Sequence, residues 1–250
     1  MGIQSYHPTL GERCMAELMG TFLLTFVGGG VAADVALLHR NTAHAGTVPT
    51  SELLLVALAH GLVLFVIVLI IGKISGAHVN PAITLSLATI GQFKWSDVPG
   101  YLIAQFAGAV VGALAIMIPF GQDIAKVGFL GRPGLAPNTS LIAGLLGEAL
   151  GAAILVITVV AVAADNRAPA GWAGLGIGMA LAAAIMFIGP ATGAAVNPAR
   201  AFGPDVISIF FGAPSVDWVA FIVCYLIGPI IGGVGAAWLY AKVSRLPRAR

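Results

Sequence analysis

Long apolar stretches dominate this chain, and shorter polar segments separate them. The stretches cover about residues 14–38, 52–72, 98–119, 140–163, 171–189 and 217–241. Because a helix needs about 20 predominantly apolar residues to cross the hydrocarbon core of a bilayer, each stretch is long enough to span a membrane. We therefore predict an all-α membrane protein with six transmembrane helices.

One short pattern occurs twice between these stretches. Ser75-Gly-Ala-His-Val-Asn-Pro-Ala82 recurs as Thr192-Gly-Ala-Ala-Val-Asn-Pro-Ala199. Asn is a preferred helix N-cap and Pro is preferred at the first helical position, so each copy predicts a loop, a cap and a helix start. We expect these helices over about 80–90 and about 197–211. At about 1.5 Å per residue, the first would be roughly 16 Å long, which is about half the thickness of a bilayer core.

Each motif is therefore predicted to open a re-entrant half-helix. The motif residues are Asn80, Pro81 and Ala82 in the first copy, and Asn197, Pro198 and Ala199 in the second. A cap uses only the side-chain oxygen of Asn, so we expect both N–H groups of each amide to face a lumen. Two capped N-termini that meet near the midplane would also bring two positive dipole ends together.

The repeat extends beyond the two loops. Ala16-Glu-Leu-Met-Gly20 in the first stretch has a counterpart in Gly147-Glu-Ala-Leu-Gly151 in the fourth. Each half contains three spans, so the second half must enter the membrane from the opposite side. We predict one domain over residues 1–250, built from inverted repeats at about 10–119 and about 140–241, with half-helices that approach from opposite faces.

Composition supports a membrane location, because 59% of the residues are hydrophobic and only 9% are charged. A net charge of +2 is too small to indicate nucleic acid as a partner. The more basic side of the predicted topology contains Arg13, Lys73, Lys94, Arg167, Lys242, Arg245, Arg248 and Arg250, and the other contains Arg40, Lys126 and Arg132. The positive-inside rule then places both termini in the cytoplasm of a multi-pass inner or plasma membrane protein.

The paired Asn-Pro-Ala motifs, with Arg200 directly after the second, closely resemble the aquaporin (major intrinsic protein) family. The matched residues Glu17 and Glu148 strengthen the resemblance, which covers essentially the whole chain. Among the family, the chain is most similar to prokaryotic members, including archaeal ones. The family implies a right-handed helical bundle with one pore in each protomer of a homotetramer. It also implies a passive water channel with no cofactor and no metal.

The resemblance also implies a selectivity filter. Counting from the two motifs places it at His60, Ile185, Ala194 and Arg200. This set is similar to that of certain plant tonoplast aquaporins, some of which also pass small neutral solutes. Beside a cationic Arg200, we expect His60 to be a neutral imidazole that can donate and accept hydrogen bonds. His78 matches a family position that lines the cytoplasmic vestibule, and Asp205 matches neither the water-specific nor the glycerol pattern.

Two interpretations of Glu17 and Glu148 remain open. Matched carboxylates within a membrane could form the proton relay of a proton-coupled secondary transporter. Alternatively, each carboxylate could accept hydrogen bonds from the backbone N–H groups of a re-entrant loop, which lack partners in a membrane. The resemblance favours the second interpretation.

An enzyme is not expected, because the sequence shows no intramembrane His/Asp/Glu cluster, paired acidic site or Ser-His constellation. The sequence therefore predicts a passive water channel that excludes protons and ions. It leaves open whether ammonia, glycerol or urea also pass.

Overall fold

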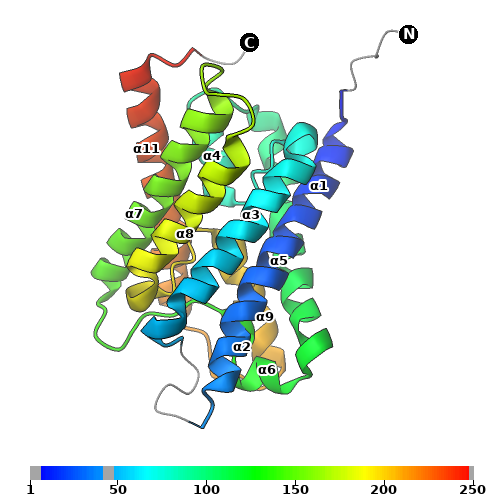
Figure 1. Cartoon of the computed structure of the whole chain (residues 1–250), viewed down its shortest axis with the longest axis vertical. Helices are drawn as coiled ribbons and strands as arrows, with labels where there is room; N and C mark the ends of the chain where they lie inside the picture. Colours follow the sequence, from blue (N-terminus) through cyan, green and yellow to red (C-terminus); the bar gives the residue numbers. More distant parts are fainter. Residues whose placement is uncertain (1–6, 42–47, 248–250) are drawn as a thin grey trace.

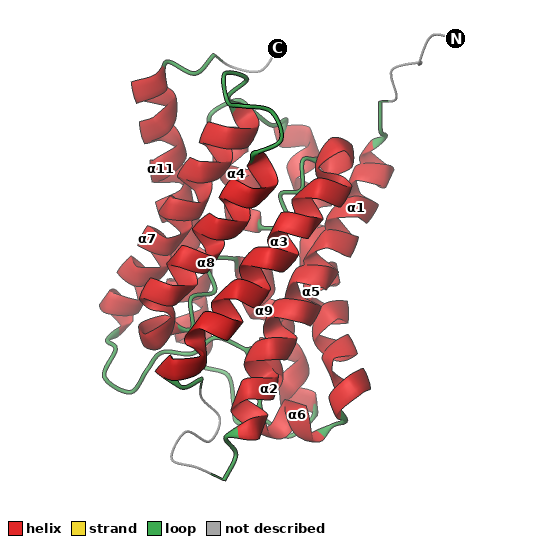
Figure 2. Cartoon of the chain, in the orientation of Figure 1, coloured by secondary structure: helices red, strands yellow, loops and turns green. Residues whose placement is uncertain are grey.

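The computed structural model describes residues 7–41 and 48–247, and within these ranges the chain is helical with no strand (Figure 2). The positions of Arg248 and Arg250 lie outside the described residues. The first half contains α1 (Leu10–Leu23), η1 (Leu24–Gly29), α2 (Gly30–Leu38), η2 (Thr50–Glu52), α3 (Leu53–Ser75), α4 (Pro81–Thr89), η3 (Trp95–Asp97) and α5 (Val98–Phe120).

A connecting segment follows and contains α6 (Asp123–Val127) and η4 (Phe129–Gly131). The second half contains α7 (Leu141–Val159), η5 (Val160–Ala164), α8 (Ala173–Thr192), α9 (Pro198–Phe210), α10 (Trp218–Ala220), η6 (Phe221–Ile227) and α11 (Gly228–Ser244). The order of long and short helices in the second half therefore repeats that of the first.

Six helical segments of the described chain are long and apolar enough to cross a membrane, which confirms the predicted spans. They are Leu10–Leu38, Thr50–Ser75, Trp95–Phe120, Leu141–Ala164, Ala173–Thr192 and Trp218–Ser244. Each differs from the predicted range by only a few residues at either end. Many of the large apolar side chains on these helices are exposed, as expected for surfaces that contact lipid or a neighbouring protomer.

The two short helices α4 and α9 lie at opposite ends of the bundle, as Figure 1 shows. The described parts of the chain begin and end near the α4 end, which is consistent with an even number of crossings. Asn80 and Asn197 are the N-caps of these helices, and Pro occupies the first position of each. The Asn-Pro pairs therefore start the half-helices as their cap chemistry predicts.

Glycines allow the long helices to pack closely in pairs. A Cβ atom added at Gly108 of α5 would overlap the carbonyl oxygen of Leu18 in α1. One added at Gly232 of α11 would overlap the carbonyl oxygen of Ala149 in α7. Small residues at membrane helix crossings permit this backbone approach, and the two crossings occupy similar places in the two halves.

We predict that Gly232→Ala destabilises the protein, because the added methyl group forces α11 away from α7. Overpacking of this kind costs about 1–3 kcal/mol. Gly235→Ala is the matched control, since its added Cβ would meet nothing within 4 Å beyond its immediate neighbours and the backbone of its own helix. Thermal unfolding of the purified protein should show a lower midpoint for Gly232→Ala only; equal midpoints would contradict this account of the α7–α11 contact.

Candidate functional site

The two Asn-Pro-Ala motifs meet inside the bundle through reciprocal hydrogen bonds. Nδ2 of Asn80 donates to the carbonyl oxygen of Val196 at 2.9 Å, and Nδ2 of Asn197 donates to that of Val79 at 2.8 Å. The side-chain oxygens cap their own helices, since Oδ1 of Asn80 accepts from the N–H of Ala82 at 2.8 Å. Each amide therefore keeps one uncommitted N–H group rather than the two expected from the sequence.

The loops before the motifs have an unusual backbone. Gly76 and Gly193 end α3 and α8 with φ values of 88° and 77°. Val79 and Val196 follow with φ values of 43° and 44°, in the left-handed region that β-branched residues rarely adopt. This conformation persists only where surrounding contacts hold it.

Glu17 supplies such contacts for the first loop. Its Oε1 accepts from the N–H of His78 at 2.9 Å and from Ser75 Oγ at 2.7 Å. Its Oε2 accepts from the N–H of Val79 at 2.6 Å and from Nε2 of Gln105 at 2.8 Å. Four donors therefore surround this fully buried carboxylate.

Glu148 supports the second loop in a similar way, with three donors. Its Oε1 accepts from Thr192 Oγ1 at 2.7 Å and from the N–H of Ala195 at 3.0 Å. Its Oε2 accepts from the N–H of Val196 at 2.6 Å. Tyr225 completes the loop by donating to the carbonyl oxygen of Thr192, as Tyr101 does to that of Ser75, both at 2.7 Å. Neither Tyr101 nor Tyr225 belongs to a recognisable sequence motif, so the sequence did not indicate their role.

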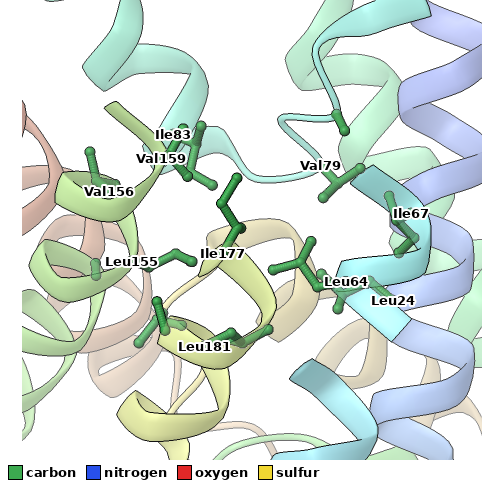
Figure 3. Close-up of a cluster of buried hydrophobic side chains, with 14 of the residues drawn as sticks. Leu24, Leu64, Ile67, Val79, Ile83, Leu155, Val156, Val159, Ile177 and Leu181 are labelled. Carbon is green, nitrogen blue, oxygen red and sulfur yellow. The ribbon is translucent and has the colours of Figure 1, made fainter. Parts of the chain in front are cut away.

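A narrow chamber lies beside the meeting point of the motifs. It leaves about 10 Å³ in which the centre of a water molecule can move, which is room for roughly one water molecule. Its polar lining residues are His60, His78, Asn80, Asn197 and Arg200. Figure 3 shows part of its apolar wall, where Leu24, Leu64, Ile83, Leu155 and Leu181 converge from separate helices. The chamber therefore has mainly apolar walls with a few polar groups.

His60 and Arg200 contact each other at one end of this chamber. Nδ1 of His60 lies 2.9 Å from the carbonyl oxygen of Val56, which can only accept, so Nδ1 carries the proton. Nε2 then accepts from Nε of Arg200 at 3.2 Å. His60 thus donates through Nδ1 and accepts through Nε2, and both of these contacts are with protein groups. Nη1 of Arg200 has no hydrogen-bond partner in the described chain.

A wider space of about 330 Å³, which we call the vestibule, adjoins the narrow chamber at Arg200. Both Arg200 and Ile185 line it, and Arg200 also lines the narrow chamber. Ala194 is buried in the same apolar cluster as Ile185, and its N–H donates to Thr192 Oγ1 at 3.0 Å. The structure thus brings Arg200 against His60 and places Ile185 beside Arg200 in the lining of the vestibule, whereas Ala194 lines neither space.

His78 lines the narrow chamber and packs against Phe93 and Tyr101, with ring centroids at 4.7 and 5.2 Å. Its Nδ1 lies 3.1 Å from Oγ1 of Thr84. That hydroxyl donates to the carbonyl oxygen of Asn80 and accepts from Gln105, so Nδ1 of His78 must donate to it. Nε2 of His78 therefore remains an acceptor.

Gly28 is a further residue that sequence reasoning missed. A Cβ atom there would lie 2.5 Å from Nε2 of His60 and would overlap the neighbouring ring carbon. The imidazole therefore depends on the missing side chain at Gly28 for its place beside Arg200. Only the crossing of two helices brings these residues together, so no local pattern in the sequence could have indicated it.

Comparisons with known proteins agree with this geometry. The family model described as Major intrinsic protein matches residues 4–240. A probable aquaporin AqpM of Archaeoglobus fulgidus is 38% identical over 246 residues, which is 95% of this chain and 98% of that protein. Aquaporin NIP1-1 of Zea mays is 35% identical over 229 residues, covering 92% of this chain and 73% of that protein.

The fold also matches a solved structure, that of the aquaglyceroporin from Plasmodium falciparum. The TM-score is 0.78 at 26% identity, over 94% of this chain and 97% of that chain. The family match, the relatives and the six apolar spans all point to one assignment. The chain belongs to the major intrinsic protein, or aquaporin, family of membrane channels and is not an enzyme.

Proposed function

We propose that this protein is a passive channel for water that excludes protons and other ions. The observation that carries the proposal is the junction of Asn80 and Asn197, which leaves one N–H group on each amide beside a chamber as narrow as a single water molecule. Osmotic and concentration gradients alone drive the flow.

The junction orients a water molecule in transit. Its oxygen accepts from the remaining N–H groups of Asn80 and Asn197, so its own hydrogens point away along the passage. It then has no lone pair in line with a neighbouring water to receive a proton. The N-termini of α4 and α9 also raise the energy of a cation at this point, because both helix dipoles present their positive ends.

The filter comprises His60, Ile185, Ala194 and Arg200. Arg200 binds permeant oxygens through its guanidinium, which stays charged and repels cations. His60 orients Arg200 by accepting from its Nε. Ile185 and Ala194 have apolar side chains, so passage of small neutral solutes such as ammonia, glycerol or urea besides water remains a question for flux measurements.

Glu17 and Glu148 support the re-entrant loops in this proposal, and Ser75, Thr192 and the loop N–H groups are the donors they hold. A proton relay requires carboxylates with access to a water path. Both carboxylates are fully buried and do not line the narrow chamber. This arrangement favours loop support over the alternative of a proton-coupled transporter.

We also propose a homotetramer in the inner or plasma membrane with both termini in the cytoplasm. The excess of Lys and Arg on the side of the termini supports the orientation. The apolar outer surface of the long helices, with exposed residues such as Leu54, Leu62 and Leu69 on α3, supplies surface for contacts between protomers.

Proteoliposomes test the proposed function directly. We expect osmotic shock to cause rapid shrinkage at the same rate with and without an imposed proton gradient, measured by stopped-flow light scattering. Parallel gradients of glycerol, urea and ammonia define the solute range. Solute accumulation driven by the proton gradient would instead establish the transporter.

We predict that Arg200→Val preserves most of the water permeability but admits protons or monovalent cations, because it removes the fixed charge from the constriction. Arg40→Val is the matched control, since Arg40 is exposed and does not line the chamber or vestibule. A pH-sensitive dye inside the vesicles reports the leak. If Arg200→Val and Arg40→Val leak equally, Arg200 is not the barrier.

We predict that Gly28→Ala lowers water permeability at least about twofold, because the displaced His60 ring no longer fits beside Arg200 and obstructs a passage one water wide. Gly30→Ala is the control, since the nearest atom to its added Cβ is an Ile116 carbon at 3.8 Å. Flux measurements at matched protein content compare the two variants. Unchanged permeability in Gly28→Ala would show that the position of His60 does not limit flow.

A further inference from the structure

Three exposed cations lie at the end of the bundle where the described chain begins and ends (Figure 1). Lys94 follows α4 and is the N-cap of η3. Lys242 lies in the last turn of α11, and Arg245 is the C-cap of that helix. We call these three residues the basic rim.

A contact between two distant segments brings the basic rim together. Nε2 of Gln92 donates to the carbonyl oxygen of Pro247 at 2.7 Å. Lys94 lies two residues after Gln92, and Arg245 lies two residues before Pro247. Lys242 is about one helical turn before Arg245 on α11, which packs against α4. Cations from two remote parts of the sequence therefore share one edge of the bundle.

The described residues form no ion pair with the basic rim. Lys94 acts electrostatically on Asp97, but Nη2 of Arg13 already donates to that carboxylate at 2.7 Å. Asp165, near the same end, is likewise engaged by Arg167 through two side-chain hydrogen bonds. These two carboxylates are thus committed to other cations, and the basic rim keeps its positive charge.

The surface beside the basic rim indicates that it lies at the level of lipid headgroups. Val243 of α11 is 76% exposed, and Trp238, one turn before Lys242 on the same face, is 52% exposed. Because α11 belongs to a candidate membrane span, these apolar surfaces face lipid close to its end. Trp95, which follows Lys94 directly, is 58% exposed. Trp is enriched where hydrocarbon meets headgroups, so a headgroup fits this position better than a soluble anion.

We propose that the basic rim binds the headgroups of anionic phospholipids. The lipid phosphate supplies the negative charge that the described protein does not, and the acyl chains lie against the exposed apolar face of α11. No residue of the basic rim lines the narrow chamber or the vestibule, so this binding is separate from the proposed channel function.

Quenching of tryptophan fluorescence by brominated lipids tests this proposal. In the full chain, Trp172→Phe/Trp218→Phe leaves Trp95 and Trp238, both beside the basic rim, as the reporters. Vesicles contain equal fractions of either brominated phosphatidylglycerol or brominated phosphatidylcholine. We expect phosphatidylglycerol to associate at least about fivefold more strongly, which is the contribution of about one Lys or Arg near an anionic membrane surface.

Two pairs of substitutions in this background locate the preference. Lys94→Gln/Lys242→Gln should lower it at least about threefold, whereas Lys94→Arg/Lys242→Arg should keep it. Arg40→Gln/Lys126→Gln is the matched control, because it removes an equal charge at exposed positions outside the basic rim and should leave the preference unchanged. Water permeability of each variant in vesicles confirms that it is folded.

Several outcomes would overturn the proposal. They are equal quenching by the two lipids before any charge is removed, an undiminished preference in Lys94→Gln/Lys242→Gln, or an equal fall in Arg40→Gln/Lys126→Gln. If sodium phosphate abolishes the preference and sodium chloride of equal ionic strength does not, the rim binds soluble anions instead of headgroups. The comparison of the two lipids and of the two salts needs no charge variant, so it decides the question even if Lys94→Gln/Lys242→Gln does not fold.

Discussion

The whole arrangement depends on satisfying the backbone of two irregular loops inside a membrane. Lipid cannot solvate the N–H groups of these loops. Val79 and Val196 have left-handed backbones outside any helix, so their N–H groups have no helical carbonyl as a partner. One buried carboxylate in each half, Glu17 or Glu148, accepts from two consecutive N–H groups. Because these bonds fix the path of each loop, they also fix where α4 and α9 begin. The motif asparagines can then meet only because the carboxylates lie behind the loops.

The reciprocal hydrogen bonds of Asn80 and Asn197 link the two halves of the chain to each other at the junction. Each amide caps its own helix and donates to the opposite loop, so neither half-helix can shift without straining the other. The halves are not equivalent, however. Gln105 joins Glu17 to Thr84 and so to His78, whereas the described contacts of Glu148 involve only Thr192 and its loop. The half that contains α4 therefore has an additional polar chain that reaches the water path.

Sequence reasoning recovered the features that local chemistry encodes. Apolar length gave the six spans, and the Asn-Pro pairs gave the starts of α4 and α9. It missed what depends on contacts between distant segments: the second partner of each Asn amide and the engagement of both His60 nitrogens. Gly28 is the clearest example, since nothing in the sequence around a glycine of an apolar helix indicates that the His60 ring packs against it. The sequence equally showed Asp205 as unusual, but only the fold reveals that the charges of Arg132 and Arg200 act on its buried carboxylate.

The same junction bears on why a proton would not follow the water in the proposed channel. Proton transfer along a water file needs acceptors as well as donors at every step. The carbonyl oxygens of Val79 and Val196 lie at the junction, and each receives an Asn N–H, which leaves each with one lone pair. The groups left to face the lumen there are N–H donors, and Nη1 of Arg200 adds another at the constriction. The bonds that hold the two halves together thus also use part of the acceptor capacity at the point where a proton would need it.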